Sequence, residues 1–392
     1  MSVYDFDRII ERRGTGCEKW DMMEAIFRAK DLVPLWVADM DFASPPEVIE
    51  ALVRRAEHGV YGYTGCTDGY FNAVTGWMRR RHGWDVRREW VVPCPGVVPA
   101  LNVLVRAFTR PGDRIIVQQP VYHPFMLAAE NNGRRVLNNE LRLDGSRYVM
   151  DLDDLRKKAA ARRVKMLILC SPHNPVGRLW TRDELAELGR ICVDNGLVVV
   201  SDEIHSDLVL GGRRHAPFAS ISEEFAARSV VCTAPSKTFN LAGLQTANVI
   251  IPDAKLRRDY SVAQEECGFF SMNAFGTVAL EAAYMHGEPW LEALLRYIEA
   301  NLRFLSEFIT LKIPRITLIR PEATYLAWLD FRSLGMDSRA LKSFFRHSAG
   351  VALGEGHIFG HGGEGFARVN LACPRKIMEE GLERLARAID GL

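Results

Sequence analysis

The chain has 392 residues, of which 48% are hydrophobic and 25% are charged, a composition typical of a globular protein with a large core. Fifty basic residues stand against 49 acidic ones, so the formal charge of +1 gives no overall field for nucleic acid or a membrane surface. The eight cysteines lack C-x-x-C spacing, and no apolar run reaches membrane-spanning length. We expect a cytoplasmic protein with reduced thiols and no metal site, nucleic-acid partner or membrane partner.

The first part of the chain contains few periodic signals. Residues 1–45 are expected to form an arm with little regular structure, which ends at a Ser-Pro-Pro sequence suited to a helix start. Residues 47–57 then have the pattern of a helix. The glycine-rich segment that follows, residues 61–65, contains two tyrosines and predicts a loop.

Between residues 91 and 251 the pattern is that of an α/β protein. Short apolar strands alternate with helix-like stretches, which is typical of a mostly parallel sheet covered by helices on both faces. Thr181 and Glu184 match a capping box at the start of one helix, and Gly196 provides its stop. The predicted strands are residues 114–118, 164–170, 197–201, 229–233 and 248–251.

After Pro289 the order of the helix and strand patterns changes. Helix patterns alternate with strand-like runs in the order 290–309 (helix), 316–319, 324–329 (strands), 338–349 (helix), 366–371 (strand) and 375–389 (helix). We therefore predict a large domain over residues 46–289. A smaller α+β domain is predicted from residues 290–392 together with the arm, residues 1–45.

Four chemically useful side chains follow predicted strands. They are Tyr122, Asn174, Asp202 and Lys237, and the carboxyl ends of parallel strands meet at one edge of a sheet. Taken singly, each has a simpler explanation as a turn residue, a cap or a solvated lysine. Together they offer an aromatic face, an amide, a carboxylate and an amine, which is the set that pyridoxal phosphate requires. Gly96 opens a predicted helix whose first N–H groups suit a phosphate.

Several motifs are similar to those of a known family. Asn174-Pro-Val-Gly177, Asp202-Glu-Ile-His205 and Ser236-Lys-Thr-Phe-Asn-Leu-Ala-Gly243 resemble the fold-type I pyridoxal-phosphate enzymes, the class I/II aminotransferase superfamily. Within it, residues 36–42, 61–64, 273–276 and 366–374 resemble the cystathionine β-lyase branch, the MalY/PatB type of carbon–sulfur lyase. The resemblance covers nearly the whole chain. It implies the aspartate aminotransferase fold and pyridoxal 5'-phosphate as the cofactor.

The resemblance also implies a role for individual residues. The implied catalytic residues are Lys237, which would form a Schiff base and move the substrate α-proton, Asp202, which would pair with the ring nitrogen, and Tyr122, which would stack on the ring. Further implied cofactor contacts are Gly96, Val97, Val98, Asn174, His205, Ser236 and, from a neighbouring subunit of a homodimer, Tyr61. The implied substrate contacts are Arg368, Asn174, Tyr122, Val37 and Ala38, with the planar guanidinium of Arg368 suited to a carboxylate.

Two positions and two functional questions stay open at this point. Many aminotransferases have a phosphate-binding arginine where this chain has Gln245, and His361 lies in a glycine-rich segment that favours an ordinary loop position. The resemblance implies cleavage of cystathionine or related S-substituted L-cysteines to a thiol, pyruvate and ammonia. The cofactor residues serve an aminotransferase equally well. A regulatory protein that keeps the fold is the third alternative, although the chain shows no added DNA-binding segment.

Overall fold

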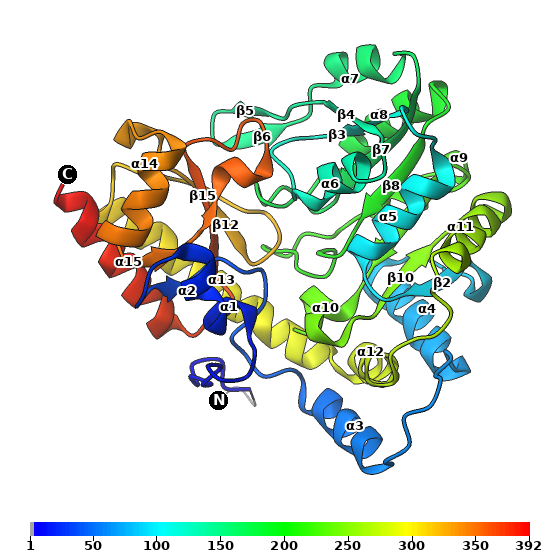
Figure 1. Ribbon diagram of the computed structural model, residues 1–392, viewed down its shortest axis with the longest axis horizontal. Coiled ribbons are helices and arrows are strands. Elements are labelled where there is room, and N and C mark those ends of the chain that lie inside the picture. Colours follow the sequence, from blue (N-terminus) through cyan, green and yellow to red (C-terminus); the bar gives the residue numbers. More distant parts are fainter. Residues whose placement is uncertain (1–3) are drawn as a thin grey trace.

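The computed structural model describes residues 4–392 of the chain. Its larger sheet has seven strands in the order β2-β10-β9-β8-β7-β3-β4, and β10 runs antiparallel to both its neighbours while the other pairs are parallel (Figure 1). The strands are β2 (Val91–Cys94), β3 (Arg114–Val117), β4 (Arg135–Asn138), β7 (Val164–Cys170), β8 (Val198–Asp202), β9 (Ser229–Thr233) and β10 (Ala247–Ile250). The fold class is thus α/β with a mostly parallel sheet, as expected.

Both faces of this sheet are buried, and the side chains of each strand alternate between them. Ile115 and Val117 of β3 belong to one hydrophobic cluster, and Ile116 between them belongs to another, because successive strand residues point to opposite faces. The first face is covered by α5 (Val97–Phe108), α6 (Pro124–Glu130) and α11 (Ala254–Glu266). The second is covered by α7 (Leu152–Ala159), α8 (Arg182–Asp194) and α9 (Glu223–Ala226).

A second, antiparallel sheet lies beside the first, with strand order β11-β12-β15-β14. Its strands are β11 (Thr317–Ile319), β12 (Leu326–Asp330), β14 (Gly354–Glu355) and β15 (Phe366–Asn370), and the helices of this region are α13 (Glu288–Lys312), α14 (Ser338–Ser343) and α15 (Arg375–Asp390). The arm joins this part of the molecule, because β1 (Val33–Pro34) pairs with β13 (Val351–Ala352). A separate hairpin is formed by β5 (Arg142–Asp144) and β6 (Arg147–Val149).

The two parts of the molecule share hydrophobic packing. One cluster of buried side chains includes Trp77 of α4 (Asp68–His82), Leu280 of α12 (Ala274–His286), Leu294 of α13 and Leu382 of α15. Helix α3 (Pro46–Glu57) packs on α12 at the lower right of Figure 1. The core therefore continues across Pro289, and the division of the chain at residues 46 and 289 stays a prediction.

Most elements follow the sequence pattern, with informative exceptions. The five predicted strands of the large sheet and the capping box at Thr181 are confirmed. Strands β2 and β4 were missed because each has only four residues and partly exposed positions. The arm was predicted to have little regular structure, but it contains α1 (Glu18–Asp21) and α2 (Met23–Phe27). No helix within residues 4–392 is both long and apolar enough to cross a membrane.

The turn at Gly177 connects the two parts of the molecule. Its carbonyl accepts hydrogen bonds from Glu322 N (2.8 Å) and Ala323 N (3.1 Å), and its φ of +69° is a left-handed value. A Cβ there would contact Pro321 Cβ and lie 2.8 Å from Pro321 Cα. A side chain at position 177 therefore meets both backbone strain and a steric clash.

We expect Gly177→Ala to lower the free energy of unfolding by roughly 3 kcal/mol, measured by urea denaturation. The matched control is Gly211→Ala, because Gly211 has the same φ of +69° and nothing within 4 Å of its added Cβ. That control should lose only about 1 kcal/mol, the cost of the left-handed conformation alone. Equal losses in the two variants would show that the Pro321 contact does not matter.

Candidate active site

Lys237 lies where the sequence predicts, after β9, in the short helix α10 (Pro235–Thr238). Its side chain is partly buried, and Nζ donates a hydrogen bond of 2.7 Å to the carbonyl oxygen of Ala38. Burial, followed by the nearby charge of Arg368, lowers the pKa of Lys237 to about 8. About one tenth of this amine is thus uncharged and nucleophilic at pH 7.

Asp202 is the last residue of β8 and is 5% exposed. Within residues 4–392, its carboxylate accepts a hydrogen bond from the backbone of Ile204 (3.1 Å). Burial raises the pKa of Asp202 to about 7, against the lowering effects of that hydrogen bond and of Lys237. A cation placed beside this carboxylate would restore its charged form, so the residue is suited to hold a protonated ring nitrogen.

Arg368 and Asn174 meet directly, although 194 positions separate them in the chain. Arg368 lies on β15 of the smaller sheet and donates through Nη1 to Asn174 Oδ1 (3.0 Å) and through Nη2 to Trp36 O (2.8 Å). Its guanidinium also lies 5.0 Å from the centre of the Phe359 ring. The buried Nε atom has no hydrogen-bond partner among the described residues. A guanidinium fixed by two such bonds is suited to bind a carboxylate.

Tyr122 and His205 both lie within electrostatic range of Arg368. Burial raises the pKa of Tyr122, an effect that Arg368 opposes and Asp202 reinforces. His205 is buried, and burial together with the charges of Lys237 and Arg368 lowers its pKa to about 3. The His205 imidazole is therefore neutral at physiological pH and offers packing or a neutral hydrogen bond.

The candidate phosphate site is built from two chain turns. Gly96 precedes α5, and its carbonyl accepts from Ala100 N (3.1 Å), so the helix begins as predicted. Strands β2 and β9 flank β10, which brings the turns at Gly96 and Ser236 to the same edge, about 10 Å apart in strand spacing. The Val97 side chain is buried in the core, whereas that of Val98 is exposed. Val97 can therefore offer a phosphate only its backbone N–H, at a helix start.

Three other positions are exposed in the single chain. Tyr61 is 55% exposed, its ring contacts Phe275 at 5.6 Å, and its hydroxyl donates to Ala56 O at 2.5 Å. Gln245 is exposed, with a left-handed φ of 46°. His361 is exposed on a loop, where its backbone N–H donates to Gln119 Oε1 at 2.9 Å, in agreement with the predicted loop position.

Val37 and Ala38 contribute through their carbonyl groups. Val37 O accepts from Asn370 Nδ2 (2.6 Å), and Ala38 O accepts from Tyr325 Oη (2.9 Å) as well as from Lys237. Sequence reasoning missed Tyr325 and Asn370. Asn370 carried a usable signal, because it lies two residues after Arg368 on a strand and therefore faces the same side.

Comparisons with known proteins show which chains this one resembles. Residues 30–385 match the model of the family described as aminotransferase class I and II. The chain is 46% identical over 385 residues to cystathionine beta-lyase PatB of Bacillus subtilis, covering 98% of this chain and 100% of PatB.

Solved structures agree over the same length. Cystalysin from Treponema denticola, which contains a pyridoxal 5'-phosphate cofactor, superposes with a TM-score of 0.97 at 40% identity and covers 99% of both chains. The pyridoxal-phosphate-bound C–S lyase from Staphylococcus hominis gives a TM-score of 0.92 at 34% identity, with 98% of both chains covered.

Proposed function

Because the chain belongs to the aminotransferase class I and II family, we propose that it is a pyridoxal-phosphate-dependent carbon–sulfur β-lyase. It would cleave cystathionine or related S-substituted L-cysteines to a thiol, pyruvate and ammonia. The observation that carries the proposal is the convergence of Lys237, Asp202 and the Arg368–Asn174 pair in a chain similar over its full length to PatB. The names of the solved relatives point to the same class.

The residues present fit pyridoxal phosphate. Lys237 supplies a partly buried amine, Asp202 a buried carboxylate with spare acceptor capacity, and the start of α5 a set of backbone donors. Ser236 stands at the second position of α10, beside Lys237, and adds a hydroxyl. When bound, the cofactor supplies an aldehyde that captures amines and a ring that withdraws electrons from the substrate α-carbon.

Different side chains of the protein would then bind the substrate and move its proton. The Arg368 guanidinium would hold the substrate carboxylate, and its hydrogen bonds to Asn174 and Trp36 fix its orientation. Lys237, with its lowered pKa, would accept the α-proton. The bond between the β-carbon and sulfur breaks, its electron pair leaves with sulfur, and water converts the remaining fragment to pyruvate and ammonia.

The pKa of Lys237 gives a pH prediction for cofactor capture. The amine attacks an aldehyde only when it is uncharged, so the capture rate in the cofactor-free chain should rise with pH and level off above about 8. Stopped-flow absorbance after mixing with pyridoxal phosphate measures this rate. A profile still rising steeply well above pH 9, as for an ordinary lysine with a pKa of roughly 10.4, would contradict the lowered pKa.

The test of the function is a panel of β-substituted amino acids without any keto-acid acceptor. We expect cystathionine or S-alkylcysteines to yield pyruvate and a thiol in equal amounts, and cystine to yield pyruvate and a persulfide. Amino transfer to a keto acid without pyruvate release would instead identify an aminotransferase. Purified protein that binds no pyridoxal phosphate would reject both enzyme activities. Protein that binds the cofactor but catalyses neither reaction would point to the regulatory alternative.

A homodimer belongs to the same proposal. Tyr61, Tyr63 and Phe270 are 55%, 92% and 78% exposed, an unusual exposure for large aromatic side chains. Coverage of this surface by a second copy would bring Tyr61 toward a neighbouring phosphate site. Sedimentation of the purified protein as a monomer would contradict this arrangement. A cytoplasmic location is also proposed, supported by the eight cysteines, all free in the structure.

A further inference from the structure

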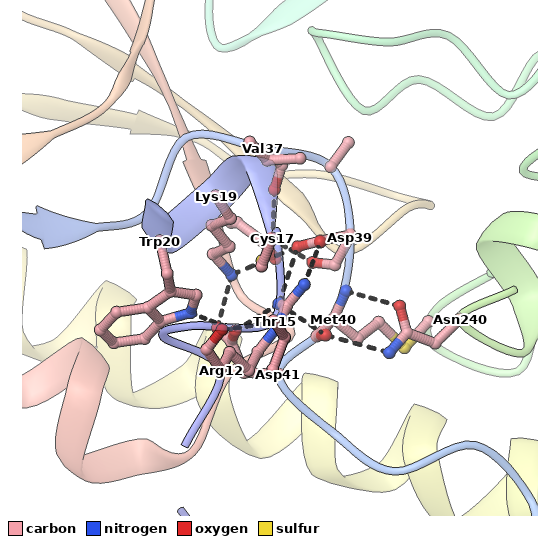
Figure 2. Close-up of polar contacts among 12 residues, drawn as sticks. Arg12, Thr15, Cys17, Lys19, Trp20, Val37, Asp39, Met40, Asp41 and Asn240 are labelled. Atoms are coloured by element: carbon pink, nitrogen blue, oxygen red, sulfur yellow. Dashed lines mark hydrogen bonds and ion pairs between the residues drawn. The ribbon is translucent and has the colours of Figure 1, made fainter. Parts of the chain in front are cut away.

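Four charged side chains of the arm, those of Arg12, Lys19, Asp39 and Asp41, form a cluster that we call the arm ion cluster (Figure 2). Arg12 contacts Asp39 at 2.5 Å and Asp41 at 2.6 Å, and Lys19 Nζ contacts Asp41 at 2.5 Å and Asp39 at 3.7 Å. Two cations face two carboxylates, so the cluster is neutral overall. Trp20 Nε1 adds a donor to Asp41 Oδ1 at 3.0 Å.

The arm ion cluster is deeply buried at its centre. The side chains of Lys19 and Asp41 are 0% and 2% exposed, whereas those of Arg12 and Asp39 are 20% and 18% exposed. A fully buried lysine is costly unless a carboxylate pairs with it. For Arg12, burial lowers the pKa, but the hydrogen bonds that it donates to Asp39 and Asp41 and the charges of these carboxylates raise the pKa by more, so the guanidinium stays charged.

Asp39 and Asp41 belong to the segment 36–41, which we call the site loop. Its carbonyl groups bind two predicted active-site residues, because Trp36 O accepts from Arg368 (2.8 Å) and Ala38 O accepts from Lys237 (2.7 Å). The other side of the loop is fixed by Asn240, whose side chain both accepts from Met40 N and donates to Met40 O at 3.0 Å. The position of this loop therefore decides where the amine and the guanidinium lie.

Asp39 also acts on Lys237 through its charge. The groups that face the Lys237 amine come from every element around it: Arg368 on β15, Asp39 on the site loop, Asp202 at the end of β8, Glu18 on α1 and His205 after β8. Arg368 opposes a positive charge on Lys237, and the three carboxylates favour it. Asp39 is the one of these carboxylates whose charge is balanced directly by Arg12 and Lys19.

We propose that Arg12 and Lys19 are positioning residues of the active site, which hold the site loop through Asp39 and Asp41 and balance the negative charge beside Lys237. Neither side chain touches the substrate or the cofactor in this role. The inference rests on the proposed function, because it treats Lys237 as the lysine that binds the cofactor. It adds that charged side chains of the arm influence the protonation of Lys237 Nζ, although the arm and Lys237 are more than 190 positions apart in the chain.

The test uses the pH dependence of the visible absorbance of the holoenzyme, which reports the protonation of the nitrogen of Lys237 bound to the cofactor. Asp39→Asn removes a nearby negative charge and should lower the pH midpoint by on the order of one unit. Lys19→Met removes a balancing cation and should raise the midpoint by a similar amount. Opposite shifts from two members of one cluster separate electrostatic balance from general damage.

Controls separate charge from positioning. The double variant Lys19→Met/Asp41→Asn restores a neutral cluster, so its midpoint should return toward that of the unmodified enzyme. Its KM should remain raised several-fold, because the site loop that orients Arg368 has lost a buried anchor. Lys30→Met, which removes an exposed lysine paired with Glu24 at 3.5 Å, should change neither quantity.

Stability needs a separate check, because loss of a buried cation can prevent folding. If Lys19→Met does not fold, Arg12→Gln removes a partly exposed cation from the same cluster and should shift the midpoint in the same upward direction. Folded variants whose midpoints shift in the same direction as that of Asp39→Asn, or do not shift, would overturn the proposal. An unmodified enzyme without any visible band would reject the proposed function instead.

Discussion

Replacing Lys237 by alanine is expected to remove the visible absorbance of bound cofactor and to lower turnover by at least about 10³-fold. The reason is that one amine serves both as the attachment point and as the proton acceptor, and among residues 4–392 no other lysine donates to Ala38 O. Lys237→Arg should be equally inactive. Its guanidinium keeps a positive charge and has no free amine at neutral pH.

The Lys237→Ala variant should still fold. Ala38 O keeps its hydrogen bond from Tyr325 Oη (2.9 Å), so loss of the lysine does not leave that carbonyl without a donor. Lys255→Ala is the matched control, because Lys255 is exposed and pairs only with Asp259 on its own helix in the structure described here. Pyruvate release at the unmodified rate in a folded Lys237→Ala variant would reject the assigned role.

Replacing Asp202 by asparagine is expected to lower kcat by about 10³-fold, although the two side chains have nearly the same shape. An amide cannot hold the ring nitrogen of the cofactor in its protonated form, so the charge that develops at the substrate α-carbon is less stabilised. The variant should retain its fold, since the amide oxygen of the substituted side chain can still accept the hydrogen bond from Ile204 N. Steady-state kinetics with the best substrate of the pyruvate panel would measure the loss.

Asp202 also predicts a pH dependence of cofactor affinity. Burial raises its pKa to about 7 in the chain without cofactor, so the carboxyl binds a proton below that pH and must release it to pair with a cationic ring. Affinity for pyridoxal phosphate should therefore weaken as pH falls through 7. In the Asp202→Asn variant, cofactor titration should show no such weakening of affinity as pH falls through 7.

A buried carboxylate close in sequence provides the contrast. Asp207 accepts hydrogen bonds from Trp77, His82 and Thr238, and the bond with His82 lowers its pKa despite the opposing effect of burial. It is thus already charged across the range in which Asp202 titrates. The Asp207→Asn variant should keep the pH dependence of cofactor affinity near pH 7. If that variant lost the pH dependence, the titrating group would not be Asp202.

The amino-acid sequence by itself determined five of the seven strands of the large sheet and the order of its functional residues. Apolar strands such as residues 164–170 are short, continuous and bounded by turns, and this local pattern reflects burial on both faces. The rule that ligands gather at the carboxyl ends of parallel strands then placed Asn174, Asp202 and Lys237 on one edge. Family motifs, which are local in the chain, supplied the cofactor.

Only the tertiary structure decided how distant segments complete the site. The bond between Arg368 and Asn174 joins two sheets, and the Ala38 carbonyl reaches Lys237 from the arm. The pKa values of Lys237 and Asp202 depend on burial and on charges from several elements, which no local pattern encodes. The pairing of Lys19 with Asp41 is of the same kind, because a buried ion pair is defined by packing and not by spacing along the chain.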